Sequence, residues 1–196
     1  MSNNMKNKLI ALFSMTIFMF LPGCKTLESA YNLTNCKYNY RSISNLTLSE
    51  MNLSNGVSVV NAAKILGILN GSSSSIPLEF TLNLDVHNPN PSGAAFQALN
   101  YIIQIDDVEF TTGYLKQAFS VGAGETKQLP INIGVDLAKL ITNNSKSAIV
   151  NIAKNFIGIG SEKSNVTIQL KPTFDVGGSL ITSPVYIPVN FSFGGK

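Results

Sequence analysis

Charge, histidine and long apolar runs are all scarce in this chain of 196 residues. Only 13% of the residues are charged, and 14 basic side chains stand against 11 acidic ones, which gives a formal net charge of +3. This near balance does not provide the basic surface that nucleic-acid binding requires. His87 is the single histidine, which excludes metal sites and catalytic mechanisms that need several histidines.

The apolar run at residues 9–21, LIALFSMTIFMFL, is too short to be a permanent membrane span. It has 13 residues, whereas a helix that crosses the hydrocarbon core needs about 20. Lys6 and Lys8 precede it and Pro22-Gly23-Cys24 ends it, which is the layout of an export signal. Removal of that signal would leave 12 basic and 11 acidic residues and a net charge of +1.

The end of this run, Leu21-Pro22-Gly23-Cys24, resembles the lipobox of bacterial lipoproteins, in which the cysteine is lipidated and becomes the first residue. We therefore expect a signal peptide over residues 1–23, lipidation of Cys24 and a polar tether over residues 24–35. Each buried methylene of the acyl chains contributes about 0.8 kcal/mol, so such an anchor is effectively permanent. The alternative is an ordinary secreted protein with a cysteine near its cleavage site.

Two further expectations follow from an acylated Cys24. Lys25 and Thr26 follow it without an acidic residue at the second position, which resembles lipoproteins sent to the outer membrane, where this one would face the periplasm. Cys36 is left without a partner for an intrachain disulfide. It is predicted to be a small buried hydrophobic residue, with a reactive thiol as the alternative.

The segment at residues 78–91, LEFTLNLDVHNPNP, predicts the central strand of the domain. Its apolar residues alternate strictly with polar ones, so a pleated strand would bury one set and expose the other. The apolar set is Leu78, Phe80, Leu82, Leu84 and Val86, and the polar set is Glu79, Thr81, Asn83, Asp85 and His87. Pro89 and Pro91 remove two backbone donors, so the strand should leave its sheet at Asn88 and Asn90.

The remaining chain predicts more strands, two helical stretches and short turns. Strands are expected at 36–48 with a bulge near 42–44, at 99–110 with a turn at Asp106-Asp107, and at 115–121, 129–135, 166–176 and 185–193, with further turns at 122–125 and 177–178. Helices are expected at 57–69, capped by Ser54 or Asn55 and stopped by Gly71, and at 137–156, capped by Asp136 and broken near 143–145. Residues 36–196 thus predict a mainly β domain, a fibronectin III or immunoglobulin-like β-sandwich of about seven strands with one or two accessory helices.

With these strands placed, the chain resembles the LEA type 2 family, whose domain is also called the water stress and hypersensitive response (WHy) domain. The residues that carry the resemblance are the alternating strand, then Asn88-Pro89-Asn90-Pro91, the strand and turn at 101–106, Gly113, and Ile187-Pro188-Val189. Asp107 departs from the pattern, because a glycine is usual there. The resemblance implies a fibronectin-like sandwich, an envelope lipoprotein in bacteria and no established enzymatic activity.

The search for chemistry gives no catalytic, cofactor or metal residues. Asp85 and His87 share the polar face of one strand, but a triad would also need a nucleophile, so a solvated face is the expected reading. The first hypothesis is therefore a non-catalytic envelope lipoprotein that binds or stabilises envelope components, possibly in stress, with Asn88 to Pro91 as a structural bend or binding motif. A carrier of a lipid or other hydrophobic ligand and a pilus or adhesin subunit are the alternatives.

Overall fold

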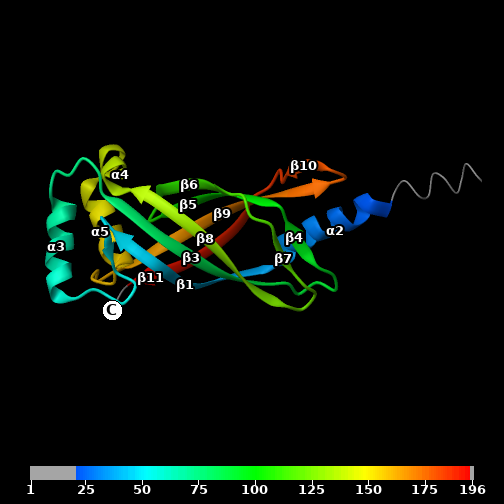
Figure 1. Ribbon diagram of the computed structural model, residues 1–196, viewed down its shortest axis with the longest axis horizontal. Helices are drawn as coiled ribbons and strands as arrows, with labels where there is room; N and C mark the ends of the chain where they lie inside the picture. The colour runs from blue at the N-terminus through cyan, green and yellow to red at the C-terminus, as the bar shows by residue number, and fades with distance from the viewer. Residues whose placement is uncertain (1–20, 195–196) are drawn as a thin grey trace, which may run out of the picture.

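Two antiparallel sheets face each other in the computed structural model, which describes residues 21–194 (Figure 1). The first sheet has the order β2-β1-β3-β8, and the second combines β10, β11, β9, β5 and β6. A small pair, β4 (Ala94–Phe96) with β7 (Phe119–Val121), lies beside them. The prediction of a mainly β sandwich is confirmed, with eleven strands in the described residues because several short ones were not foreseen.

The first sheet is built around the predicted central strand, β3 (Pro77–His87). Its partners are β1 (Lys37–Leu48) and β8 (Thr126–Asp136), and β2 (Met51–Asn52) extends the edge. Register shifts in β1 between Tyr40 and Ser42 and between Ser44 and Thr47 confirm the predicted bulge. All eleven residues of β3 pair with β8 without a shift, so β3 lies inside the sheet along its whole length.

The second sheet is centred on β9 (Lys163–Val176), which pairs with β5 (Ala98–Ile105) on one side. On its other side lie β10 (Ser179–Thr182) and β11 (Ile187–Gly194), while β6 (Val108–Leu115) extends the sheet beyond β5. The break between β10 and β11 lies opposite Pro172. The carbonyl of Pro172 accepts a hydrogen bond from the Ser183 amide, but proline has no N–H to donate back, so the chain bulges there.

The hairpin between β5 and β6 turns at Asp106-Asp107, as predicted. Both residues have positive φ, +49° and +64°, which is the two-residue turn whose twist matches that of the flanking strands. Asp106 also accepts a hydrogen bond from the Asn165 amide at 2.8 Å, which ties the turn to β9. Gly113, one of the family-like residues, lies opposite Tyr101, and a Cβ atom there would collide with the tyrosine ring.

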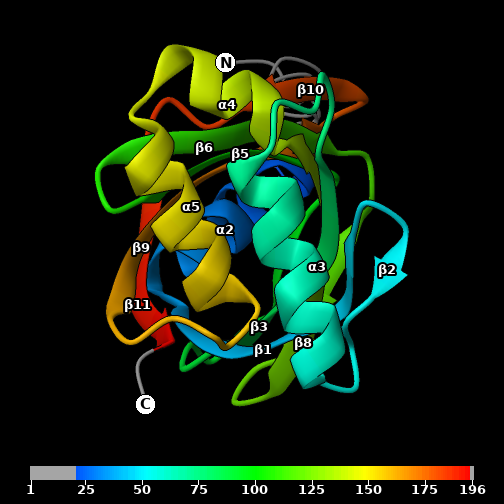
Figure 2. The ribbon, with the colours of Figure 1, turned by 90° about the vertical axis from the view of Figure 1, so that its left-hand side faces the viewer.

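Three helices cover one end of the sandwich (Figure 2). They are α3 (Val59–Asn70), α4 (Leu137–Asn143) and α5 (Lys146–Phe156). The predicted cap of the first helix was wrong, because Ser58 rather than Ser54 or Asn55 accepts the hydrogen bond from the Asn61 amide. The cap at Asp136 and the break between the second and third helices are confirmed.

Phe156 from α5 closes this end of the core. Its ring packs on Phe80, Phe110 and Phe193, with ring centroids 4.4, 6.2 and 4.8 Å away. The space left between the sheets around these rings is about 10 Å³, which is room for about one water molecule. At this place the two sheets therefore meet through their own side chains.

A helix that the sequence did not predict, α2 (Leu21–Asn35), replaces most of the expected tether. At its end Asn32 and Leu33 are 4% and 0% exposed, and the helix contacts β4 and β9. The tether prediction for residues 24–35 was therefore wrong for the part that packs on the sandwich. Residues 1–20 of the predicted signal peptide lie outside the described residues.

Candidate functional site

The outer face of the first sheet carries a ladder of neutral polar side chains. Thr81 and Asn83 on β3 were predicted to point into water, but they are only 8% and 4% exposed. Asn83 donates to Ser42 and Ser44 on β1, and its oxygen accepts a hydrogen bond from Gln128 on β8 at 2.6 Å. Polar neighbours on both sides thus cover Thr81 and Asn83, which corrects the prediction that the whole polar set of β3 faces water.

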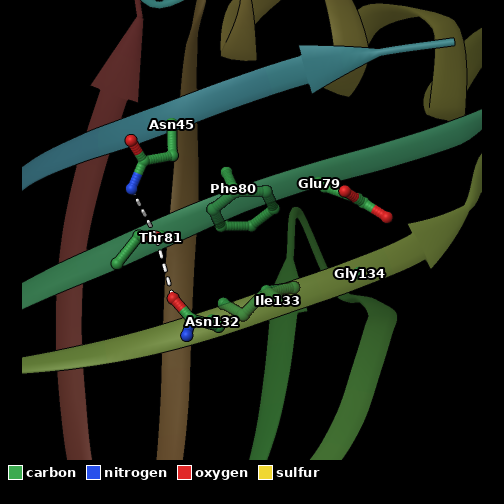
Figure 3. Close-up of a pocket in the computed structure, with 7 residues that line it drawn as sticks. All are labelled: Asn45, Glu79, Phe80, Thr81, Asn132, Ile133 and Gly134. Atoms are coloured by element: carbon green, nitrogen blue, oxygen red, sulfur yellow. Dashed lines mark hydrogen bonds between the residues drawn. The ribbon is translucent and has the colours of Figure 1, made fainter. Parts of the chain in front are cut away.

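Beside this ladder the outer face is hollowed, with a volume of about 430 Å³ (Figure 3). The Thr81 hydroxyl crosses it by donating to Asn132 at 2.8 Å and accepting from Asn45 at 3.2 Å. Glu79 lies at the rim, and Gly134 opposite it leaves space because it has no side chain. The hollow therefore offers amide, hydroxyl and carboxylate groups on an open surface.

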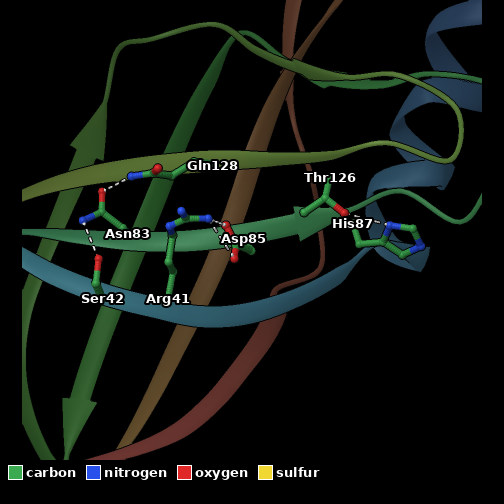
Figure 4. Close-up of polar contacts among 7 residues, drawn as sticks. All are labelled: Arg41, Ser42, Asn83, Asp85, His87, Thr126 and Gln128. Carbon is green, nitrogen blue, oxygen red and sulfur yellow. Dashed lines mark hydrogen bonds and ion pairs between the residues drawn. The ribbon is translucent and has the colours of Figure 1, made fainter.

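Asp85 and His87 lie further along the same face, and each bonds to a residue other than its neighbour in this pair (Figure 4). The Asp85 carboxylate pairs with Arg41 at 3.1 Å. The His87 Nδ1 atom lies 3.1 Å from the Thr126 hydroxyl. These contacts agree with the expected solvated face and do not form the base and orienting acid of a triad.

Asn88 is the centre of the asparagine-proline motif and is fully buried. Its amide nitrogen donates to the carbonyls of Ser92 at 2.9 Å and Gly122 at 3.0 Å, and its oxygen accepts from the Asn90 side chain at 2.7 Å. The backbone of Asn88 also pairs with Glu125 and Gly124 in the turn before β8. Both polar atoms of its side chain bond to groups within the protein, so Asn88 supports the bend that the sequence suggested.

The same motif holds α2. The Asn90 amide donates to the Asn32 carbonyl at 3.0 Å, and the Asn32 amide donates to the Ser92 hydroxyl at 2.8 Å. Ser92 in turn donates to Glu28. Pro89 and Pro91, by contrast, are exposed. We call this set of contacts between residues 88–92 and α2 the motif junction.

The two cysteines lie at different places relative to α2. Cys24 lies in the first half of α2, ahead of the motif junction. Cys36 follows the helix and is 8% exposed, and burial raises the pKa of its thiol. The prediction that Cys36 is a buried hydrophobic residue is confirmed, and a raised pKa disfavours the nucleophilic thiolate.

Several functional features were missed in the sequence. Asn32, Ser92 and Glu28 gave no signal, because each depends on a contact more than 50 positions away. The burial of Thr81 and Asn83 could have been suspected, since these two are neutral while Glu79, Asp85 and His87 on the same face are ionisable.

The described residues contain no group of three or more histidine, cysteine or acidic side chains placed to hold a metal ion. Among residues 21–194, no helix has the length and apolarity needed to cross a bilayer. The fold places the protein in the class of antiparallel β-sandwiches. The polar side chains on the outer face of its first sheet and in the motif junction are hydrogen-bonded to one another.

Comparison with known proteins identifies the family. Residues 83–190 match the LEA type 2 model, described as late embryogenesis abundant protein, and this is more than half of the chain. The chain therefore belongs to the LEA type 2 family, whose members are generally non-enzymatic. No curated protein matches the chain.

The solved structures that match the chain have low sequence identity and low TM-scores. A crystal structure of a protein from Archaeoglobus fulgidus is 15% identical, covers 81% of this chain and 98% of its own, and has a TM-score of 0.36. A solution structure of a protein from Arabidopsis thaliana is 13% identical, with 80% of each chain covered and a TM-score of 0.43. A solution structure of a protein described as a putative late embryogenesis abundant protein is 15% identical, covers 96% of this chain and 89% of its own, and has a TM-score of 0.39. The family assignment rests on the family model.

Proposed function

We propose that this protein is a non-catalytic lipoprotein of the cell envelope, anchored through Cys24 in the outer membrane and facing the periplasm, where it binds or stabilises envelope components, in keeping with a stress-related family. The observation that carries the proposal is the lipobox-like sequence Leu21-Pro22-Gly23-Cys24 at the start of α2, a helix whose other end packs on the sandwich. Cys24 precedes Leu33 by nine positions, which is about 14 Å along an α-helix. An acylated Cys24 would thus hold the sandwich close to the membrane.

The open outer face of the first sheet supports a binding role over a catalytic one. Thr81 and Asn83 are already bonded to neighbours, and Asp85 is paired with Arg41, so none of them is held ready as an acid or base. The hollow over Asn132 and Gly134 gives an envelope component a concave polar surface.

No second function is proposed. A carrier of hydrophobic ligands needs an internal apolar cavity of several hundred Å³. Between the two sheets around Phe156, where the helices cover the core, the space is about 10 Å³, so this part of the described residues does not favour that role. A pilus subunit built by strand exchange needs an open groove or a free donor strand. Here β11 is paired along all eight residues with β9 of its own domain.

The experiment is membrane fractionation of the full chain made in a bacterium that lipidates exported proteins. We expect the unchanged chain and a Cys36→Ala control in the membrane fraction, extracted only by detergent. Cys24→Ala should lose the acyl chains and be released or mislocalised. A Cys24→Ala chain that stays in the membrane like the control would contradict the anchor, and a hydrolase activity abolished by His87→Ala would contradict the non-catalytic role.

A further inference from the structure

A group of exposed apolar side chains lies at the end of the molecule where α2 begins. Four large apolar side chains of residues 180–186 are exposed: Leu180 by 65%, Ile181 by 51%, Val185 by 55% and Tyr186 by 43%. We call these four the hairpin surface. Leu180 and Ile181 are consecutive in a strand and so point to opposite faces, and the exposure of both shows that β10 stands clear of the sandwich.

The sequence explains why this hairpin projects. Gly177 and Gly178 form its turn with positive φ, +62° and +86°. Pro172 interrupts the pairing further back, and the resulting bulge between β10 and β11 turns Val185 and Tyr186 outward. The hairpin surface therefore follows from the turn at its tip and from the missing backbone donor behind it.

The position of the hairpin indicates what covers it. In Figure 1 the turn between β9 and β10 points toward the same end of the molecule as the amino-terminal end of α2, whereas α3, α4 and α5 cover the opposite end. α2 is fixed by the motif junction, so Cys24 lies about 14 Å along the helix axis from the docked Leu33. A membrane that holds Cys24 would thus lie within reach of the hairpin.

The order of side chains along the hairpin fits a shallow position in a lipid surface. Leu180 and Ile181 lie nearer the turn, and Tyr186 lies further back with the Lys171 ammonium 5.0 Å from its ring centroid. Aliphatic side chains prefer the acyl boundary, and tyrosine and lysine prefer the headgroup level. Asp175, opposite Leu180, accepts a hydrogen bond from the Gly178 amide at 2.8 Å, and its charge limits the depth to the headgroup layer.

We propose that the hairpin surface rests in the headgroup layer of the membrane that holds Cys24, so that the protein touches lipid at two places and keeps one orientation. This inference rests on the proposed lipid anchor. It adds that the outer face of the first sheet keeps a fixed angle to the membrane, whereas a domain held by the lipid anchor alone would rotate freely.

The test uses the full lipidated chain in vesicles of phosphatidylethanolamine and phosphatidylglycerol. Leu180→Cys is labelled with an environment-sensitive fluorophore, and Val60→Cys on α3 is the matched control, because Val60 is also 65% exposed but lies at the opposite end. The unsubstituted chain shows how much label the buried Cys36 takes up. Nitroxide lipids labelled at the headgroup report contact, and sedimentation of the same samples reports vesicle binding.

We expect the label at position 180 to shift to shorter wavelength and to lose emission to the nitroxide lipids, and the label at position 60 to do neither. Equal and weak quenching at both positions in chains that sediment with the vesicles would overturn this inference and leave the lipid anchor standing. Chains that do not sediment would overturn both. A label at position 180 that is already shielded in detergent, in a particle of doubled mass, would assign the hairpin surface to a second copy and overturn the lipid contact.

Discussion

Replacement of Asn88 by alanine tests whether the motif junction is structural. The side chain is 0% exposed and donates to the carbonyls of Ser92 and Gly122 while its oxygen accepts from Asn90. Alanine leaves these two half-buried carbonyls without this donor, and it also removes the bond to the buried carbonyl of Val121 at 3.3 Å. Each buried group left unpaired costs about 1–3 kcal/mol, so Asn88→Ala should lower the free energy of unfolding by about 3 kcal/mol.

The assay is urea denaturation followed by circular dichroism. With a slope of about 2 kcal/mol per molar urea, the midpoint should fall by about 1.5 M for Asn88→Ala. Asn39→Ala is the matched control, because Asn39 is exposed on β1, and surface changes of this kind stay within about 0.5 kcal/mol. Equal midpoints for the two variants would refute the structural role of Asn88.

Three further variants test other parts of the account. Leu33→Ala should lower the free energy of unfolding by about 3 kcal/mol, because Leu33 is 0% exposed and its removal would leave a cavity. Tyr31→Ala is the control, because Tyr31 is 68% exposed, and equal effects of the two changes would mean that α2 is not part of the fold. Asp107→Gly should raise the thermal midpoint, with a gain of up to about 1 kcal/mol, because glycine relieves a positive φ; Asp106→Gly, which loses the bond to Asn165, should show no such gain, and equal gains would contradict the explanation. A hydrogen bond from the amide of Ile76 holds the pKa of Asp136 below its ordinary value of 3.8. The ionised carboxylate therefore stabilises the folded state above pH 3.8, and this contribution is lost as the pH falls through the lower pKa of the folded state. The urea midpoints of the native chain and of Asp136→Asn should converge below pH 3.8, and a difference that stays constant with pH would contradict the linkage.

The fold was largely predictable because its signals are local. The alternation in β3, the turn residues at Asp106-Asp107 and the cap at Asp136 each act on neighbours within a few positions, and all three hold in the structure. The bend after β3 was also predictable, because Pro89 and Pro91 lack donors whatever surrounds them.

The missed features depend on distant partners. α2 has a weakly apolar sequence, and it is fixed at its end by Asn90 and Ser92, which lie about 60 positions away. The polar ladder needs the side chains of β1 and β8 on either side of Asn83, and β10 needs the bulge opposite Pro172. A single sequence cannot show such pairings, since they arise only when the sheets assemble.

The most direct test of the lipid anchor is the intact mass of the mature protein extracted from membranes, with fragmentation to locate the modified residue. The account predicts an amino terminus at Cys24 that carries a diacylglyceryl group on sulfur and an acyl chain on nitrogen. An unmodified amino terminus at any other residue would contradict it.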